Sequence, residues 1–143
     1  MSRGVASAAL ALAALVATSV GAAADGDAAN GKAVFRKCMA CHKVGDGATN
    51  GVGPVLTGVV GRKSGTVEGY GYSDSNKNAG AQGLVWTEEN LKAYLPDPSA
   101  FLKQYLTDQK KPELFTGNSK MPFKLADEAE RADVIAYLKT FSK

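Results

Sequence analysis

The pentapeptide Cys38-Met39-Ala40-Cys41-His42 constrains this chain more than any other feature of its sequence. The spacing C-x-x-C-H is typical of covalent haem attachment, in which two thiols bond the porphyrin and the imidazole binds its iron. Cys38 and Cys41 are the only cysteines of the chain, and His42 is its only histidine. Because no other thiol or imidazole competes for these roles, the motif predicts one covalently bound haem c, with its iron, per chain.

A bare C-x-x-C pair has three other uses: a thioredoxin-like redox pair, half of a zinc site, or a short-loop disulfide. A zinc site needs two more Cys or His ligands, which the sequence does not contain. A thioredoxin motif belongs to a βαβ pattern, and the sequence around Cys38 lacks that pattern. We therefore interpret the pair as a haem attachment site.

Residues 1–24 have the pattern of a secretory signal peptide. Arg3 gives a short positive start, residues 5–20 form an uncharged run rich in Ala, Leu and Val, and Ala22-Ala23-Ala24 fits a small-x-small cleavage site. The alternative is an uncleaved membrane anchor, because the uncharged run approaches the length of a bilayer span. Its Ala-rich composition is only weakly hydrophobic, and no flexible linker follows it, so we expect cleavage before Asp25.

Thioether attachment takes place outside the cytoplasm, so both signals predict a periplasmic protein. The mature chain, residues 25–143, has the length of one small domain. The full chain carries +3, and the loss of Arg3 leaves about +2. No basic stripe is visible, so the sequence does not support nucleic-acid binding. Since a domain of this size buries little apolar surface, we expect the haem-free chain to be largely unfolded.

The pattern predicts helices at both ends of the domain. A first helix should begin at Asp27 or Asn30 and run toward Cys38, and a last helix should cover about 127–141 with an apolar side. Thr87 is expected to cap a helix that Pro96 and Pro98 end, followed by a short helix over 99–106. Residues 45–83, rich in Gly, Ser and Asn, predict a long irregular segment that wraps a flat ligand. The expected fold class is a small all-α domain.

Elimination narrows the second axial ligand of the iron to one methionine. Met1 leaves with the signal peptide, and Met39 lies between the haem-bonding cysteines on the His42 side. Met121 remains, in a segment that Pro122 restricts to extended conformations. The alternative is a methionine that fills a gap in the core. His/Met ligation raises the reduction potential and leaves no open position on the iron, so Met121 indicates electron transfer rather than oxygen chemistry.

Over its whole mature length the chain resembles the class I cytochromes c, most closely the bacterial c2-type carriers and their mitochondrial relatives. Gly31 and Phe35 precede the pentapeptide as in the first helix of that family, and Val134 and Tyr137 stand where its last helix crosses the first. The resemblance therefore implies a single-domain fold of helices and loops around one haem.

The resemblance also implies roles for further residues. Gly53-Pro54 is similar to the turn whose proline carbonyl accepts the proton of the proximal imidazole, so Pro54 would orient His42. The other implied haem-pocket residues are Arg62, Tyr72 and Trp86 as propionate donors, Asn76 and Tyr94 in the interior near Met121, and Ser119 beside a propionate. Each could instead be core packing, a partner of backbone groups or a solvated charge. Two propionates in an apolar pocket demand charge-assisted donors, which favours haem contact for Arg62.

The docking surface of the family is only partly present. Lys37, Lys120 and Lys124 fit its lysine ring around the haem edge, and Phe123 matches the aromatic over that edge, whereas Ser99 and Ala100 replace expected lysines. Between Leu95 and Met121 the chain is also longer than in mitochondrial forms. We expect a weaker and less salt-sensitive contact with redox complexes than in the most basic relatives.

The sequence thus predicts a soluble, monomeric periplasmic carrier of one electron that is not an enzyme and does not insert into the membrane after signal cleavage. Its donor and acceptor stay open: a cytochrome bc complex, a terminal oxidase, a photosynthetic reaction centre or a periplasmic dehydrogenase. The alternative is a haem-binding subunit or small haem enzyme with peroxide or gas-ligand chemistry. That function needs an open or labile iron position, which the setting of Met121 disfavours.

Overall fold

Each α-helix begins at a short polar side chain that accepts a hydrogen bond from a backbone amide of the first turn. In the computed structural model, which describes residues 25–142, these caps are Asp27, Ser73, Thr87, Asp97 and Asp127. The helices that they open are α1 (Ala28–Phe35), α2 (Asp74–Ala81), α3 (Glu88–Tyr94), α4 (Pro98–Asp108) and α5 (Glu128–Lys139), with a 3-10 turn η1 (Pro112–Leu114) after α4.

The expected all-α fold class is confirmed for this part of the chain, where β-structure is limited to one isolated bridge between Lys63 and Val85. The first cap is Asp27 rather than Asn30. The predicted signal peptide lies outside the described residues. Among residues 25–142, no helix has both the length and the apolar character needed to cross a membrane.

Two expectations about the helices were wrong. Pro98 does not close α3, which ends at Tyr94. Pro98 lies instead in the first turn of α4, where the N–H that proline lacks would have no helical partner, and α4 continues to Asp108. Residues 45–83 are not irregular throughout, because α2 forms within them. Its sequence, DSNKNAGA, has no apolar periodicity, and its buried residues are Ser75, Asn76, Ala79 and Gly80.

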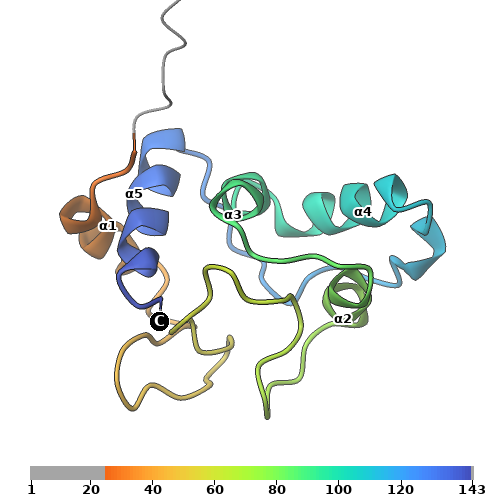
Figure 1. Ribbon diagram of the computed structural model, residues 1–143, viewed down its shortest axis with the longest axis horizontal. Coiled ribbons are helices and arrows are strands. Elements are labelled where there is room, and N and C mark those ends of the chain that lie inside the picture. Colours follow the sequence, from red (N-terminus) through yellow and green to blue (C-terminus); the bar gives the residue numbers. More distant parts are fainter. Residues whose placement is uncertain (1–24, 143) are drawn as a thin grey trace, which may run out of the picture.

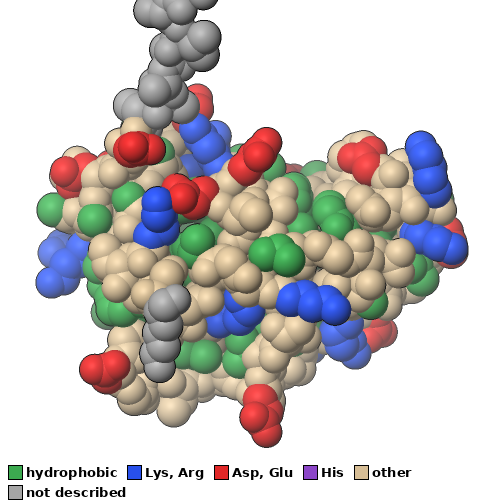
Figure 2. Space-filling model, in the orientation of Figure 1, with side chains coloured by type: hydrophobic (Ala, Val, Ile, Leu, Met, Phe, Trp, Pro, Cys, Tyr) green, Lys and Arg blue, Asp and Glu red, His purple; other side chains and the backbone are tan. Residues whose placement is uncertain are grey.

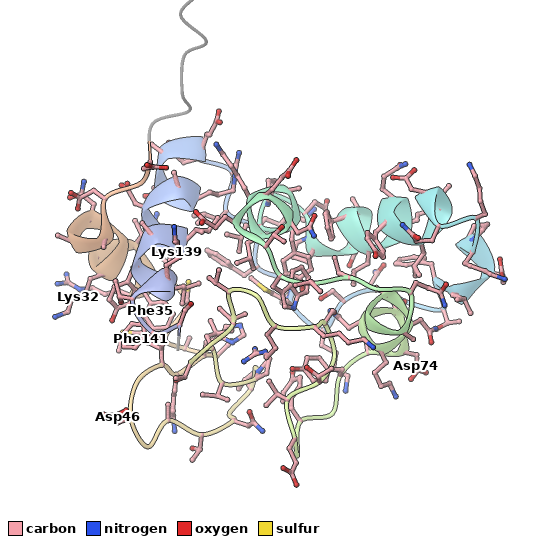
Figure 3. All side chains as sticks on the ribbon, viewed as in Figure 1. Lys32, Phe35, Asp46, Asp74, Lys139 and Phe141 are labelled. Atoms are coloured by element: carbon pink, nitrogen blue, oxygen red, sulfur yellow. The ribbon has the colours of Figure 1, made fainter. Side chains whose placement is uncertain are left out.

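The first and last helices pack directly on each other, to one side of the molecule in Figure 1. Gly31 permits the close approach, since a Cβ there would lie 1.9 Å from the Asp133 carbonyl oxygen. Phe35 and Tyr137 pack across the crossing with ring centroids 5.5 Å apart, and Figure 3 labels Phe35 beside the end of α5. In Figure 1, helix α3 lies between the α1–α5 pair on one side and helices α2 and α4 on the other. The loops of residues 43–72 pass below these helices (Figure 1).

Candidate haem-binding site

One cavity of about 330 Å³ lies between the helices and the loops, within the usual range of ligand sites. Its aliphatic walls include Leu56, Val59, Leu91 and Leu138. All eleven site residues predicted from the sequence line it: Cys38, Cys41, His42, Pro54, Arg62, Tyr72, Asn76, Trp86, Tyr94, Ser119 and Met121.

The two thiols and the imidazole reach the cavity because tight turns follow α1. The amides of Cys41 and His42 both donate to the Cys38 carbonyl, at 3.1 and 2.9 Å, which coils the pentapeptide. Burial and the neighbouring Cys41 raise the pKa of the Cys38 thiol to about 11, against a smaller lowering by Lys37. A thiol with that pKa is protonated at neutral pH, the opposite of the acidic thiol of a redox C-x-x-C pair. Residues 25–142 also hold no cluster of three or more His, Cys, Asp or Glu side chains that could bind a metal.

The His42 ring is held in one orientation. Its Nδ1 lies 2.8 Å from the Pro54 carbonyl oxygen, so Nδ1 carries the proton and donates, and Nε2 keeps its lone pair. Gly53 passes so close that a Cβ would lie 2.4 Å from His42 Cε1. Burial lowers the pKa of His42, the Pro54 hydrogen bond opposes this, and the Arg62 charge adds to the lowering. The result is a neutral imidazole with a free nitrogen, as an iron ligand must be.

Arg62 is a half-buried cation with an unused donor. Its Nη1 and Nη2 donate to the carbonyls of Thr57 and Val55, at 3.3 and 3.1 Å. Its Nε is buried without a partner. Burial lowers the pKa of the guanidinium, and proximity to Tyr72 opposes this. A buried donor of positive charge fits an anionic group such as a propionate.

Tyr72 and Trp86 line the same cavity as Arg62. The Tyr72 hydroxyl accepts from the Val67 amide at 3.2 Å, which leaves its own hydrogen available to donate. Burial raises the pKa of this phenol, against smaller lowering by the Val67 hydrogen bond and Arg62. The group therefore stays protonated at neutral pH. Together with the orphan Nε of Arg62, this donor set fits the acidic edge of a haem.

A chain of hydrogen bonds fixes the backbone next to Met121. The Met121 amide donates to Ser119 Oγ at 3.2 Å, and that oxygen lies 3.1 Å from the Tyr94 hydroxyl. Asn76 accepts from Ser73 Oγ at 2.9 Å through its side-chain oxygen. Burial raises the pKa of Tyr94, while hydrogen bonds from Ser119 and Asn76 lower it by less. The half-buried Met121 thus lies in the cavity on a well-anchored segment.

The predicted docking lysines differ in their surroundings. Lys37 binds Glu130 at 2.6 Å and Lys124 binds Asp97 at 2.6 Å. Lys120 donates to the Gly71 carbonyl and is the one of the three without a carboxylate partner in the described chain. Lys37 and Lys120 line the cavity, but Lys124 does not.

Phe123 also lines the cavity and is 36% exposed. Val52, 74% exposed, is a second apolar residue of the rim that the sequence did not single out. Met39 is 62% exposed and does not line the cavity, as expected from its place between the cysteines.

Sequence reasoning also missed the serines behind the site. Ser73 caps α2 and bonds Asn76, Ser75 of the same helix bonds residues 116 and 117, and Ser99 Oγ accepts from the Ser119 amide at 3.0 Å. A Ser followed by a helix-compatible run could have indicated the cap at Ser73. The partners of Ser75 and Ser99 lie 41 or 42 and 20 residues away in sequence, and no local pattern marks them.

Comparisons with known proteins show which family the chain resembles. The family model described as cytochrome c matches residues 28–142. Cytochrome c2 iso-1 of Rhodospirillum centenum is 60% identical over 111 residues, which are 78% of this chain and 92% of that protein. A cytochrome c2 of Rhodopseudomonas palustris is 56% identical over 109 residues, 76% of this chain and 93% of that protein.

The solved structure of cytochrome c2 from Rhodospirillum centenum superposes with a TM-score of 0.81 at 58% identity, covering 82% of this chain and all of that one. In this family the Cys38–Cys41 pair implies covalently bound haem c, so the cofactor prediction is confirmed. The chain belongs to the class I cytochromes c, within the cytochrome c2 group, and is a monohaem electron carrier rather than an enzyme.

Proposed function

We propose that Cys38 and Cys41 would hold the haem through thioether bonds, that His42 and Met121 would bind its iron, and that electrons would pass at the cavity rim near Phe123. The observation that carries this proposal is the convergence of both cysteines, the neutral imidazole and Met121 on one apolar cavity. The haem iron supplies the one-electron chemistry by alternating between two oxidation states. The side chains around the haem provide every other part of the function.

Those side chains hold the site rigid. Pro54 keeps the imidazole of His42 in one tautomer and orientation, and Ser119 keeps the backbone of Met121 in place. Arg62, Tyr72 and Trp86 serve the propionates as donors, and Asn76 and Tyr94 fill the Met121 side. Because these contacts fix the side chains that would bind the iron, electron exchange would need little reorganisation, and the apolar walls would keep water away from the site.

The proposed place of action is the periplasm, after cleavage before Asp25. The proposed partners are redox complexes that dock transiently, through acidic groups near Lys120 and an apolar contact at Phe123. Lys37 and Lys124 bind carboxylates of their own chain and so add less direct contact. A short-lived complex of this kind needs only a small interface.

Intact mass under denaturing conditions tests the attachment and the cleavage together. The protein purified from a periplasmic fraction should have the mass of residues 25–143 plus one haem, and acid acetone should not remove the haem. Free polypeptide mass, or haem extracted by acid acetone, contradicts the thioether bonds. A mass that includes residues 1–24 leaves the haem site intact but contradicts signal cleavage.

The substitution Met121→Ala tests the axial ligand. Loss of the thioether removes the ligand that favours ferrous iron, so the reduction potential should fall and the ferrous protein should bind carbon monoxide, which the parent resists. Met39→Ala is the matched control, because Met39 is exposed and does not line the cavity. If Met121→Ala keeps the potential and ligand resistance of the parent, Met121 is core packing and another group is the ligand.

A further inference from the structure

The segment that leads from α4 to Met121 is tied to α2 by side-chain hydrogen bonds. Ser75, which is fully buried, accepts from the Thr116 amide at 3.2 Å and donates to the Gly117 carbonyl. One turn further along α2, the side-chain Nδ2 of Asn78 donates to the Leu114 carbonyl at 2.8 Å. This segment belongs to the extra length between Leu95 and Met121, so α2 acts as its anchor.

Helix α4 holds the next part of the same segment. Ser99 Oγ accepts from the Ser119 amide at 3.0 Å, and Ser119 Oγ accepts in turn from the Met121 amide at 3.2 Å. Two hydrogen bonds therefore connect α4 with the backbone of Met121. Neither Ser75 nor Ser99 lines the haem cavity, so both are placed to act on Met121 through the backbone of its segment.

We propose that Ser75 and Ser99 are positioning residues that hold Met121 against displacement from the iron, an inference that rests on the proposed Met121 ligation. The two side chains hold the end of the segment that leads into Met121, at residues 116–117 and at residue 119. When either hydroxyl is lost, its backbone partners must find water instead, and the open position of the segment becomes more populated. The anchoring of residues 116–117 also explains why Ser75 is buried in a helix that has no apolar stripe.

Imidazole is the probe for this proposal, because it can bind the iron only when Met121 has moved away. Its apparent dissociation constant therefore falls in proportion to the rise in the open population. Loss of one or two hydrogen bonds should tighten apparent imidazole binding by about three- to tenfold in Ser75→Ala and in Ser99→Ala. The titration is read from the absorption band of Met–iron ligation, in the purified ferric haem protein.

Thr57→Val is the matched control. Thr57 Oγ1 accepts from the Gly45 amide at 2.9 Å and donates to its carbonyl at 3.1 Å, the same two-way pattern as Ser75, but in a loop on the His42 side. Its valine variant removes both bonds with little change of shape. We expect a loss of denaturant stability comparable to that of Ser75→Ala, with imidazole affinity unchanged from the parent.

The outcomes distinguish the positioning role of Ser75 and Ser99 from the Met121 ligation on which it rests. A parent protein without the Met–iron band overturns the Met121 ligation itself. A parent with the band, and imidazole affinities unchanged in both serine variants, overturns the positioning role alone. Equal tightening in Thr57→Val also overturns it, because the effect is then general loosening. If Ser75→Ala does not fold, the half-buried Ser99 decides the question.

Discussion

At the scale of single residues, Arg62 has the least satisfied surroundings in the haem cavity. Two of its nitrogens donate to backbone carbonyls of the loop before it, but the buried Nε has no protein partner. A buried cation is stable only when its charge and its hydrogens are matched. The anionic edge of the haem would supply both the opposite charge and the missing acceptor, and Arg62 would then link the loop of residues 55–57 to the cofactor.

Arg62→Gln should therefore weaken both the fold and the ferrous state. Two backbone carbonyls lose their donor, which should cost about 1–3 kcal/mol of unfolding free energy. Loss of a positive charge near the iron favours the ferric form, so the reduction potential should fall. Denaturant unfolding and redox titration measure the two effects. Lys63→Gln, which removes the neighbouring exposed charge, is the control and should leave both values close to the parent.

Tyr94 should make stability depend on pH in the alkaline range. Burial raises its folded pKa, while the unfolded phenol titrates near its ordinary value of about 10. Above that pH the unfolded chain releases a proton that the folded chain keeps. The unfolding free energy therefore falls, by up to about 1.4 kcal/mol per pH unit, until the folded pKa is reached. Urea unfolding of Tyr94→Phe between pH 8 and 11 should show a smaller alkaline fall than the parent, and equal slopes would contradict the assignment.

At the scale of elements, the crossing of α1 and α5 requires very close packing. Gly31 meets the backbone of α5, not a movable side chain, so a methyl group there cannot be accommodated by a rotamer change. Phe35 and Tyr137 then fill the space beside the contact. Because the Cys38–His42 turn follows α1 directly, this crossing also sets the position of the haem attachment site.

Gly31→Ala should destabilise the protein by about 1–3 kcal/mol or more, since the added Cβ forces the two helices apart. The shift should reach the haem site, so the spectrum of the folded variant should also change. Lys32→Ala leaves a methyl side chain at the next position of α1, which is exposed, and should change stability by at most about 0.5 kcal/mol. Thermal unfolding of both variants makes the comparison, and equal midpoints contradict the steric role of Gly31.

The helix boundaries differ in how well the sequence alone predicts them. Asp27 and Thr87 were predictable caps because capping depends on neighbours three residues away. Pro98 was misread because a proline is compatible both with the end of one helix and with the start of the next. Helix α2 was missed because its stability comes from the Ser73 cap and from bonds to residues 114–117, far along the chain.

The residues that line the cavity could be predicted from the sequence more completely than the fold. Spacing places Cys38, Cys41 and His42 together, and elimination leaves Met121 as the candidate ligand, so these predictions need no knowledge of tertiary structure. The serines that anchor the Met121 segment could not be predicted, because a serine is common on any surface. Only the folded chain brings their distant partners within hydrogen-bond distance.

At the scale of the whole molecule, charge is mixed rather than gathered. Figure 2 shows acidic and basic side chains interspersed over the visible face. Five ion pairs of the described residues use Lys37, Lys77, Lys92, Lys124 and Lys139. Residues 25–143 carry only about +2, so the attraction of an acidic partner depends on local asymmetry near the haem rim rather than on net charge.

Two variants with the same net charge test that local asymmetry. Lys120→Glu changes the cavity rim, whereas Lys111→Glu lies beyond the far end of α4, a helix roughly 16 Å long. Screening acts over about 10 Å at ordinary ionic strength, so the nearer charge should count more. Electron transfer to an acidic partner should slow with salt in the parent. It should slow further at low salt in Lys120→Glu, and much less in Lys111→Glu, with nearly unchanged reduction potentials.

Lys37→Glu extends the comparison to a rim lysine that binds a carboxylate of its own chain. It should slow transfer at low salt, but less than Lys120→Glu, because the ammonium of Lys37 is already engaged by Glu130 and offers less to a partner. The measurement is the second-order rate constant against ionic strength for the parent and all three variants. Four flat profiles would reject a lysine-edged docking surface and point to an apolar contact centred on Phe123, which Phe123→Ala would then weaken at every salt concentration.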